Sequence, residues 1–352
     1  MTKILISHPI HPVTIRRLGL RLANVSDIFS FPEEFFYRDG SDEEIIYIPN
    51  ISLKQTPDEQ NDPSLDILRQ ALTVFQPDVL IVGNNAVPKL AIAAWRKAVG
   101  YNKNLLIIRR GVDTRAIDKE AARQYQVGVD NLPGINSPYV AQHMSRYLQL
   151  YKTELKRKLA IIGTGNIGKN IALDGIAWEL DVHLLSPSLQ DPHKRQLTLW
   201  QRGIPSKKVV CAQNYDRVFE NATYVAISVP WENSDGSHNT DIIDEHHIRS
   251  LAPNARIVSA SVPRIFSERA LALMNEWVRQ EKIFLRIDTS KRRAQEVKKH
   301  YPNIDAAHDV AFASPECQQE LDNAMLIKAR EFLPTSVWDK VLVGGKRQLS
   351  AI

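Results

Sequence analysis

The chain has 352 residues and a formal net charge of +5, with 43% hydrophobic and 24% charged residues. This length allows two domains and burial of about three-quarters of the unfolded surface, and the composition is that of an ordinary globular protein. No apolar run approaches the roughly 18 residues of a membrane span, and the basic residues are mostly scattered. We therefore expect neither a membrane nor a nucleic-acid partner.

The cysteines and the N-terminal segment indicate the compartment. Cys211 and Cys317 lack the spacing of metal ligands and are too few for a disulfide framework. Met1–Ile10 is too short and too lightly apolar for a signal peptide. The sequence therefore predicts a cytoplasmic protein with reduced thiols and no bound metal.

Short apolar runs alternate with helical sequence in the first part of the chain. They lie at Lys3–Ser7, Val79–Gly83 and Leu105–Ile108, and their length is typical of buried parallel strands. This alternation predicts a parallel sheet with helices on both faces. Residues Asn131–Gly134 combine Asn, Pro and Gly and predict a hinge.

A second alternating series begins at Leu159. Its predicted strands are 159–162, 182–185, Lys208–Val210, Tyr224–Val229, Arg256–Ser259 and Ile283–Ile287, and Ile304–His308 is expected to lead back to the first domain. We predict an α/β fold with two doubly wound parallel-sheet domains. A flavodoxin-like substrate domain comprises residues 1–134 and 308–352, and a Rossmann dinucleotide-binding domain comprises residues 135–307.

A glycine-rich turn follows the strand predicted at 159–162 and precedes a helical pattern. Gly163 allows a tight turn, Gly165 the approach of a pyrophosphate, and Gly168 close packing of helix on strand. The phosphates would face the unpaired N–H groups of the helix N-terminus. The predicted cofactor contacts in this turn are Gly163, Thr164, Gly165, Asn166, Ile167 and Gly168.

The residue expected to select between NAD and NADP is not acidic. Eighteen residues after Gly168 comes Ser186, where Asp or Glu would bind the ribose hydroxyls of NAD. Ser188, Lys194 and Arg195 follow in the same loop, and hydroxyls with cations accept a 2′-phosphate better than a carboxylate does. The loop favours NADP, with NAD as the alternative. The other interpretation is a polar surface loop that does not distinguish NADP from NAD.

From Leu105 to about Phe332 the sequence resembles the D-2-hydroxyacid dehydrogenases. The matching segments, in the order that the family has them, are Arg110–Asp118, Val129–His143, Ile161–Gly168, Ser228–Trp231, Leu285–Asp288 and His308–Ala311. The resemblance implies an NAD(P)-dependent oxidoreductase that reduces a small 2-oxo acid, or a related carbonyl or imine, by hydride transfer. Negative charge develops on the carbonyl oxygen in this reaction, so a cation and a proton donor must face it.

The resemblance also implies roles for individual residues. His308 would be the acid/base group, Asp288 would orient the nicotinamide, and Val229 and Pro230 would contact the cofactor. Backbone amides of the Gly83–Asn85 loop, that is Gly83, Asn84 and Asn85, would bind the substrate carboxylate, with Arg110 as a nearby cation. Asn84 and Asn85 are equally ordinary turn residues.

Two expected catalytic residues are replaced. The family's substrate-binding arginine falls on Val262, and its glutamate falls on Arg293. Arg264 is the available replacement cation, although a surface arginine in a turn explains it equally well, and Glu296 replaces the glutamate only if the loop is longer. The alternative function is therefore a dinucleotide-binding sensor or scaffold with altered or no turnover.

The arm that joins subunits in this family is short here. Only Tyr151–Lys158 lies between the helix predicted at Val140–Leu150 and the strand at Leu159. The resemblance therefore implies a homodimer with a shortened arm.

Overall fold

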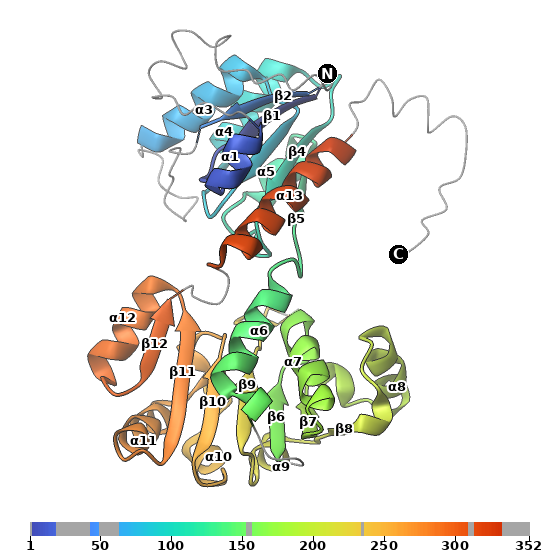
Figure 1. Cartoon of the computed structure of the whole chain (residues 1–352). Coiled ribbons are helices and arrows are strands. Elements are labelled where there is room, and N and C mark those ends of the chain that lie inside the picture. The colour runs from blue at the N-terminus through green and yellow to red at the C-terminus, as the bar shows by residue number, and fades with distance from the viewer. Residues whose placement is uncertain are drawn as a thin grey trace. The chain divides into compact units, whose positions relative to one another are not determined.

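The computed structural model describes residues 2–18, 43–48, 63–152, 157–233, 236–308 and 313–332. The chain divides into two compact units (Figure 1): unit 1 comprises Met1–Ile135 with Pro315–Ile352, and unit 2 comprises Asn136–Ser314. The second boundary differs from the predicted one at 308. Strand β12 (Asp305–His308) belongs to unit 2, because it pairs with β11 in the sheet of that unit, and the chain returns to unit 1 after it.

Unit 1 contains a five-stranded parallel sheet with the order β2-β1-β3-β4-β5. Its strands are β1 (Thr2–Ile6), β2 (Glu43–Tyr47), β3 (Val79–Val82), β4 (Leu105–Arg109) and β5 (Val127–Asn131). This is the flavodoxin-like order. The sequence interpretation missed β2 and β5, because two glutamates open β2 and because β5 contains a glycine and runs into the breakers after Asn131.

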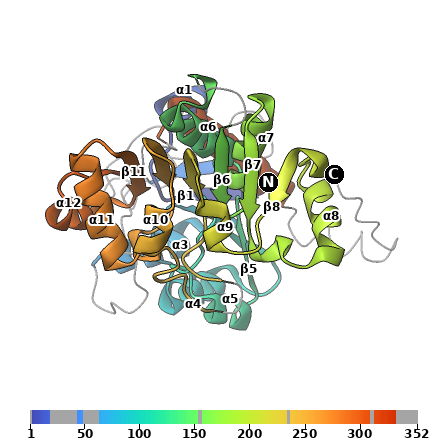
Figure 2. The ribbon, with the colours of Figure 1, turned by 90° about the horizontal axis from the view of Figure 1, so that it is seen from below.

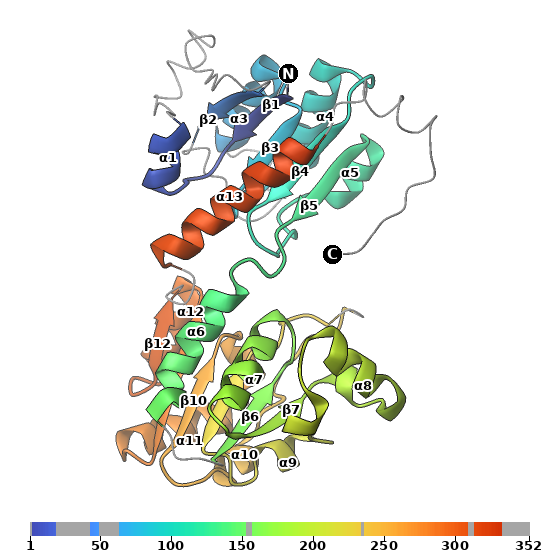
Figure 3. The same cartoon turned by 45° about the vertical axis from the view of Figure 1, so that its right-hand side comes forward.

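Helices cover both faces of this sheet, as Figures 2 and 3 show. On one face lie α3 (Pro63–Phe75), α4 (Lys89–Val99) and α5 (Lys119–Gln124), which pack with Leu80 and Val82 of β3 into one hydrophobic core. Near the other face lie α1 (Pro12–Leu18) and α13 (Pro315–Glu331), which contact each other, and α13 also contacts β4. The last described helix of the chain is therefore part of the first unit.

Unit 2 contains a seven-stranded parallel sheet with the order β12-β11-β10-β9-β6-β7-β8. Its other strands are β6 (Lys158–Ile162), β7 (Asp181–Leu185), β8 (Val209–Cys211), β9 (Tyr224–Ile227), β10 (Ala255–Ser259) and β11 (Ile283–Thr289). This is the Rossmann order extended by β12. The predicted fold class, two doubly wound parallel-sheet domains, is confirmed.

The position of β6 in the middle of the sheet explains why its sequence is apolar without interruption. Leu159 and Ile161 pack toward α6 (Ser137–Leu148) and α7 (Asn166–Ala177), whereas Ala160 and Ile162 pack into the core on the opposite face. That opposite core includes side chains of α9 (Tyr215–Phe219), α10 (Glu245–Arg249), α11 (Glu268–Arg279) and α12 (Lys291–His300). Figure 2 shows α6 and α7 on one side of the sheet and α9 and α10 on the other.

Two further observations concern the predicted partners. Among the helices that the structure describes, none has both the length and the apolar character needed to cross a bilayer. Of the short segment predicted as a dimer arm, residues 153–156 lie outside the described part of the chain.

Candidate functional site

The strand order of unit 2 has its switch point between β6 and β9, because the chain leaves these two neighbouring strands toward opposite edges of the sheet. Ligands of doubly wound folds bind at the carboxyl ends of the strands at such a switch point. The loop after β6 holds Gly163, and the loop after β9 holds Ser228, whose hydroxyl donates to the Gly163 carbonyl at 3.1 Å. The two loops are therefore joined directly at the position predicted for the cofactor.

The three glycines of this turn differ in what surrounds them. Gly163 has φ +89°, and a Cβ there would lie 2.6 Å from the Ser228 carbonyl oxygen. A Cβ on Gly168 would overlap the carbonyl oxygen of Gly163. A Cβ on Gly165 would meet nothing within 4 Å. The protein itself requires glycine at 163 and 168, whereas Gly165 borders open space.

This open space lies at the start of α7. Gly165 is the N-cap residue of α7, and no side chain caps the helix there. The first N–H groups of a helix lack partners within the helix and attract anions, so the turn provides donors for a pyrophosphate. The residues present therefore fit a dinucleotide.

A cluster of polar side chains lies beside the turn, at the end of β7. Arg202, at the C-cap of α8 (Pro192–Gln201), donates to Thr164 Oγ1 at 2.5 Å and to Ser188 Oγ at 2.9 Å. Ser186 Oγ lies 3.0 Å from Ser188 Oγ. Burial lowers the pKa of Arg202, which nevertheless remains a cation because its ordinary pKa is so high. We call Thr164, Ser186, Ser188 and Arg202 the hydroxyl–arginine cluster.

Arg202 was missed by the sequence interpretation, which proposed Lys194 and Arg195. The Lys194 side chain is 79% exposed and pairs with Asp191 at 3.8 Å. Arg195 Nε donates to the Leu189 carbonyl at 2.8 Å. No motif marks Arg202, because it follows Ser186 by a full helix and reaches the turn only through the fold.

The loop after β9 is held by Ser261. The Ser261 hydroxyl accepts from the N–H of Val229 and donates to the Val229 carbonyl, both at 2.9 Å. The Pro230 carbonyl accepts from Asn239 Nδ2 at 2.8 Å. Val229 and Pro230 therefore form a fixed edge next to the glycine turn.

The proposed acid/base region lies on the last two strands of unit 2. In the register of β11 and β12, Asp288 lies opposite Ala307, and Thr289 lies opposite His308. Asp288 is buried, whereas His308 is exposed at the end of its strand. His143 of α6 is a further titratable group near Asp288: its Nε2 is buried and has no hydrogen-bond partner in the described residues. Burial lowers the pKa of His143, and the charge of Asp288 opposes that shift.

The positions of the missing catalytic residues have ordinary surroundings. Val262 packs against the hydrophobic core of unit 2. Arg264 lies in the short 3-10 helix η5 (Pro263–Ile265) and is exposed. Arg293 is exposed on α12, and Glu296 on the same helix pairs with Arg292 at 3.2 Å, as on a solvated helix face.

Unit 1 has its own switch point, between β1 and β3. The loop after β3 carries Gly83, and a Cβ there would lie 2.9 Å from the Cβ of His8, which follows β1. Asn85 Nδ2 donates to the Ser7 carbonyl at 3.4 Å, and Arg109 donates to Asn84 Oδ1. The structure thus brings the predicted Gly83–Asn85 loop against the end of β1.

His8 is a second residue that the sequence interpretation missed. It is 4% exposed, and neither ring nitrogen has a hydrogen-bond partner in the part of the chain that the structure describes. Burial, assisted by the charges of Arg110 and Arg109, lowers the pKa of His8 to about 3. The ring is therefore neutral at physiological pH and keeps one unpaired donor and one unpaired acceptor.

Arg110 is held by side chains of α13, the last described helix, which belongs to unit 1. Its Nη2 donates to Gln318 Oε1 at 2.6 Å and lies 3.2 Å from Asp322 Oδ1, both on α13. Asp322 Oδ2 accepts from the N–H of His11 at 2.7 Å, and burial raises the pKa of this carboxyl. The cation predicted for substrate binding is thus fixed by contacts within unit 1.

Fold and site together define a two-unit α/β protein whose second unit has the strand order and glycine turn of a dinucleotide-binding domain. The family model described as "D-isomer specific 2-hydroxyacid dehydrogenase, NAD binding domain" matches residues 131–283. The match includes the glycine turn and the strands around it, so the resemblance expected from the motifs is confirmed over these residues. A search of the curated proteins finds no match to this sequence.

Solved dehydrogenase structures share the fold of nearly the whole chain. The apo-structure of D-lactate dehydrogenase from Escherichia coli has a TM-score of 0.59 and 14% identity, and covers 91% of this chain and 93% of that chain. A D-2-hydroxyisocaproate dehydrogenase has a TM-score of 0.61 and 14% identity, covering 94% and 96%. NAD-dependent formate dehydrogenase from Staphylococcus aureus, in complex with NAD, has a TM-score of 0.58 and 15% identity, covering 99% and 97%. At such identities the likeness establishes the fold alone.

Alanine substitutions at two glycines test the cofactor turn. Gly165→Ala should leave the thermal unfolding midpoint unchanged but weaken NADPH and NADH binding by about tenfold or more, because its Cβ enters the open space. Gly168→Ala should lower the midpoint clearly, because its Cβ overlaps the Gly163 carbonyl. Thermal unfolding and fluorescence titration measure both effects. Unchanged cofactor affinity in Gly165→Ala would contradict the assignment.

The neutral buried state of His8 predicts a pH dependence of stability. The unfolded chain gains a proton on His8 below its ordinary pKa of 6.5, whereas the folded protein gains it only near 3. Stability is therefore full above 6.5 and is lost as the pH falls, with a loss of about 1.4 kcal/mol at about pH 5.5. Urea unfolding at neutral pH and at about pH 5.5 should show this extra loss in the native protein but not in His8→Leu. Equal losses would mean that the His8 ring is not buried as a neutral group.

Proposed function

We propose that the protein is an NADP-dependent oxidoreductase that reduces a small 2-oxo acid, or a related carbonyl or imine. The observation that carries the proposal is the open, uncapped start of α7 at Gly165, next to the hydroxyl–arginine cluster. The space beside Gly165 is free of side chains, and a turn that served only to connect β6 with α7 would not require this.

The preference for NADP rests on the chemistry of the cluster. Two serine hydroxyls and the Arg202 guanidinium offer donors and a positive charge at the end of β7, where NAD-selective proteins place an acid. A guanidinium binds phosphate through charge-assisted hydrogen bonds. The 2′-phosphate of NADP would replace or join the bond that Arg202 makes to Ser188.

In this proposal unit 2 binds the cofactor and supplies the proton. The nicotinamide, when bound, donates the hydride. His308, exposed at the end of β12, donates a proton to the substrate oxygen, and Asp288 on the neighbouring strand orients the nicotinamide. Arg264 is the exposed cation that unit 2 offers in place of the one lost at Val262.

Unit 1 binds the anionic end of the substrate in the same proposal. The amides of the Gly83–Asn85 loop provide donors, and Arg110 provides positive charge from a position fixed by Asp322 and Gln318. His8, packed against Gly83, adds a neutral ring with an unpaired donor and acceptor. A neutral ring next to two arginines favours a carboxylate over a cationic substrate.

A dinucleotide-binding sensor without turnover is the second candidate. Val262 favours it, because valine supplies neither charge nor donor where a transition-state contact is expected, and losing such a contact costs about 3–4 kcal/mol. Arg293, in place of the expected glutamate, favours it as well.

Substitution of Arg202 tests the cofactor preference. Arg202→Ala should weaken NADPH binding about 10- to 100-fold, since a hydrogen bond to a charged group contributes about 1.5–3 kcal/mol, and should change NADH binding little. Fluorescence titration with both cofactors measures the ratio. Lys194→Ala is the matched control, because the Lys194 side chain is exposed and pairs with Asp191. Equal losses for NADPH and NADH would contradict a role in phosphate recognition.

The reaction is tested with a panel of 2-oxo acids and imines, by following the nicotinamide absorbance. His308→Ala should lower kcat/KM at least about 100-fold with unchanged NADPH binding, as for a general acid. His300→Ala, an exposed histidine on α12, should have native activity. If no compound is reduced although NADPH binds, and His308→Ala changes nothing, the sensor candidate replaces the enzyme.

A further inference from the structure

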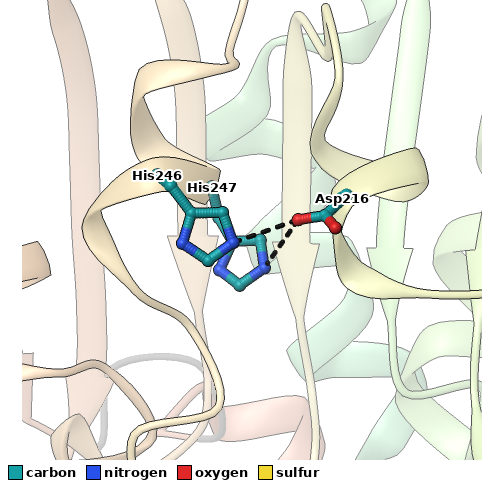
Figure 4. A group of neighbouring side chains, drawn as sticks. All are labelled: Asp216, His246 and His247. Carbon is teal, nitrogen blue, oxygen red and sulfur yellow. Dashed lines mark hydrogen bonds and ion pairs between the residues drawn. The ribbon is translucent and has the colours of Figure 1, made fainter.

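Three metal-ligating side chains converge on unit 2, on segments that the cofactor turn does not use. Asp216 lies in the first turn of α9, and His246 and His247 lie on α10 (Figure 4). Asp216 Oδ1 lies 3.0 Å from His246 Nε2 and 3.4 Å from His247 Nε2. One ligand atom from each of the three residues lies within 4.8 Å of the others.

These separations fit one small ion. Zinc lies about 2.0–2.2 Å from imidazole nitrogens and carboxylate oxygens, which places neighbouring tetrahedral ligands about 3.3 Å apart. The two separations from Asp216 bracket this value. The ligand atoms of the two histidines lie within 4.8 Å of each other, so the exposed side chains of Asp216 and His246 can close the remaining gap.

The His247 ring is already held in place. Its side chain is 8% exposed, and the ring lies beside the rings of Tyr215 and Phe219, with centroids 5.7 and 5.4 Å away. Its Nδ1 accepts from the N–H of Asp244 at 2.9 Å, which closes the N-terminal cap of α10. Nε2 is thereby turned toward Asp216, as Figure 4 shows.

The other two ligands are open to solvent. The side chains of Asp216 and His246 are 67% and 60% exposed, and the His246 ring lies over that of His247 with centroids 3.8 Å apart. An ion from solution can reach the cluster directly. Three protein ligands leave at least one coordination position for water.

We propose that Asp216, His246 and His247 bind one divalent transition-metal ion, with Zn²⁺ as the fitting case. Two imidazoles and one carboxylate suit zinc and its neighbours in the first transition row better than Mg²⁺ or Ca²⁺, which prefer oxygen ligands. The ion would connect α9 to α10. Since these helices belong to different crossovers of the sheet, the site would stabilise this face of unit 2.

Metal binding would rearrange the protons of the His247 ring. Because the Asp244 N–H donates to Nδ1, the neutral His247 ring carries its proton on Nε2 in the metal-free protein. A metal ion bound to Nε2 replaces the proton on that nitrogen, and Nδ1 gains a proton by exchange with water. The N–H of Asp244 then loses its acceptor. Metal binding therefore opens this one cap bond, while Asp244 Oδ1 keeps its bonds from Glu245 N–H and the Ser267 hydroxyl.

The test uses the full chain, freed of metal with a chelator and titrated with ZnCl₂ by calorimetry. We expect saturable binding of one ion per chain. His246→Ala and Asp216→Asn should each weaken it about tenfold or more. Both residues are exposed, so these variants should fold as the native protein does, which thermal unfolding without metal checks. Absence of saturable one-to-one binding overturns the proposal.

A second histidine–carboxylate pair provides the matched control. His183 Nε2 lies 2.8 Å from Asp181 Oδ2, but no third ligand is grouped with them among the described residues. His183→Ala should leave zinc binding unchanged, and a loss equal to that of His246→Ala would show nonspecific surface binding and overturn the proposal. NMR gives an independent readout: zinc should shift the backbone amide resonance of Asp244. An unmoved Asp244 amide at saturation would exclude His247 Nε2 as a ligand.

Discussion

The structure of unit 2 depends on a steric contact between two stretches of backbone. The start of α7 passes so close to the end of β6 that residue 168 has no room for a side chain, and residue 163 is confined by the carbonyl of Ser228. This contact brings the helix N-terminus to the switch point between β6 and β9. The dinucleotide site follows from it, because the donors of α7 then face open space at Gly165.

The sequence predicted those features that depend on neighbouring residues. The glycine turn and the runs around it were found because strand, turn and helix follow one another within about 30 residues. Continuous apolar runs such as Leu159–Ile162 also indicated parallel sheets, since helices cover both faces. Strands β2 and β5 were missed because acidic residues, glycine and nearby breakers weaken the same pattern.

Residues that meet only through contacts between distant parts of the chain could not be predicted from a local pattern. Arg202 reaches Thr164 from the far end of α8, and His8 meets Gly83 only because β1 and β3 are neighbours in the sheet. Asp216 and the two histidines of α10 lie thirty residues apart and have no recognisable ligand spacing. Of the two cations predicted there, Lys194 pairs with Asp191, and Arg195 donates to the Leu189 carbonyl.

The return of α13 to unit 1 has a consequence for synthesis of the chain on the ribosome. Domains tend to fold as they emerge, N-terminal first. Arg110 and the N–H of His11 find Asp322 only after all of unit 2 has been translated. Until then a partly buried cation and a backbone donor of the nascent first unit lack their carboxylate, so the sheet of unit 1 forms early and the surroundings of Arg110 are completed last.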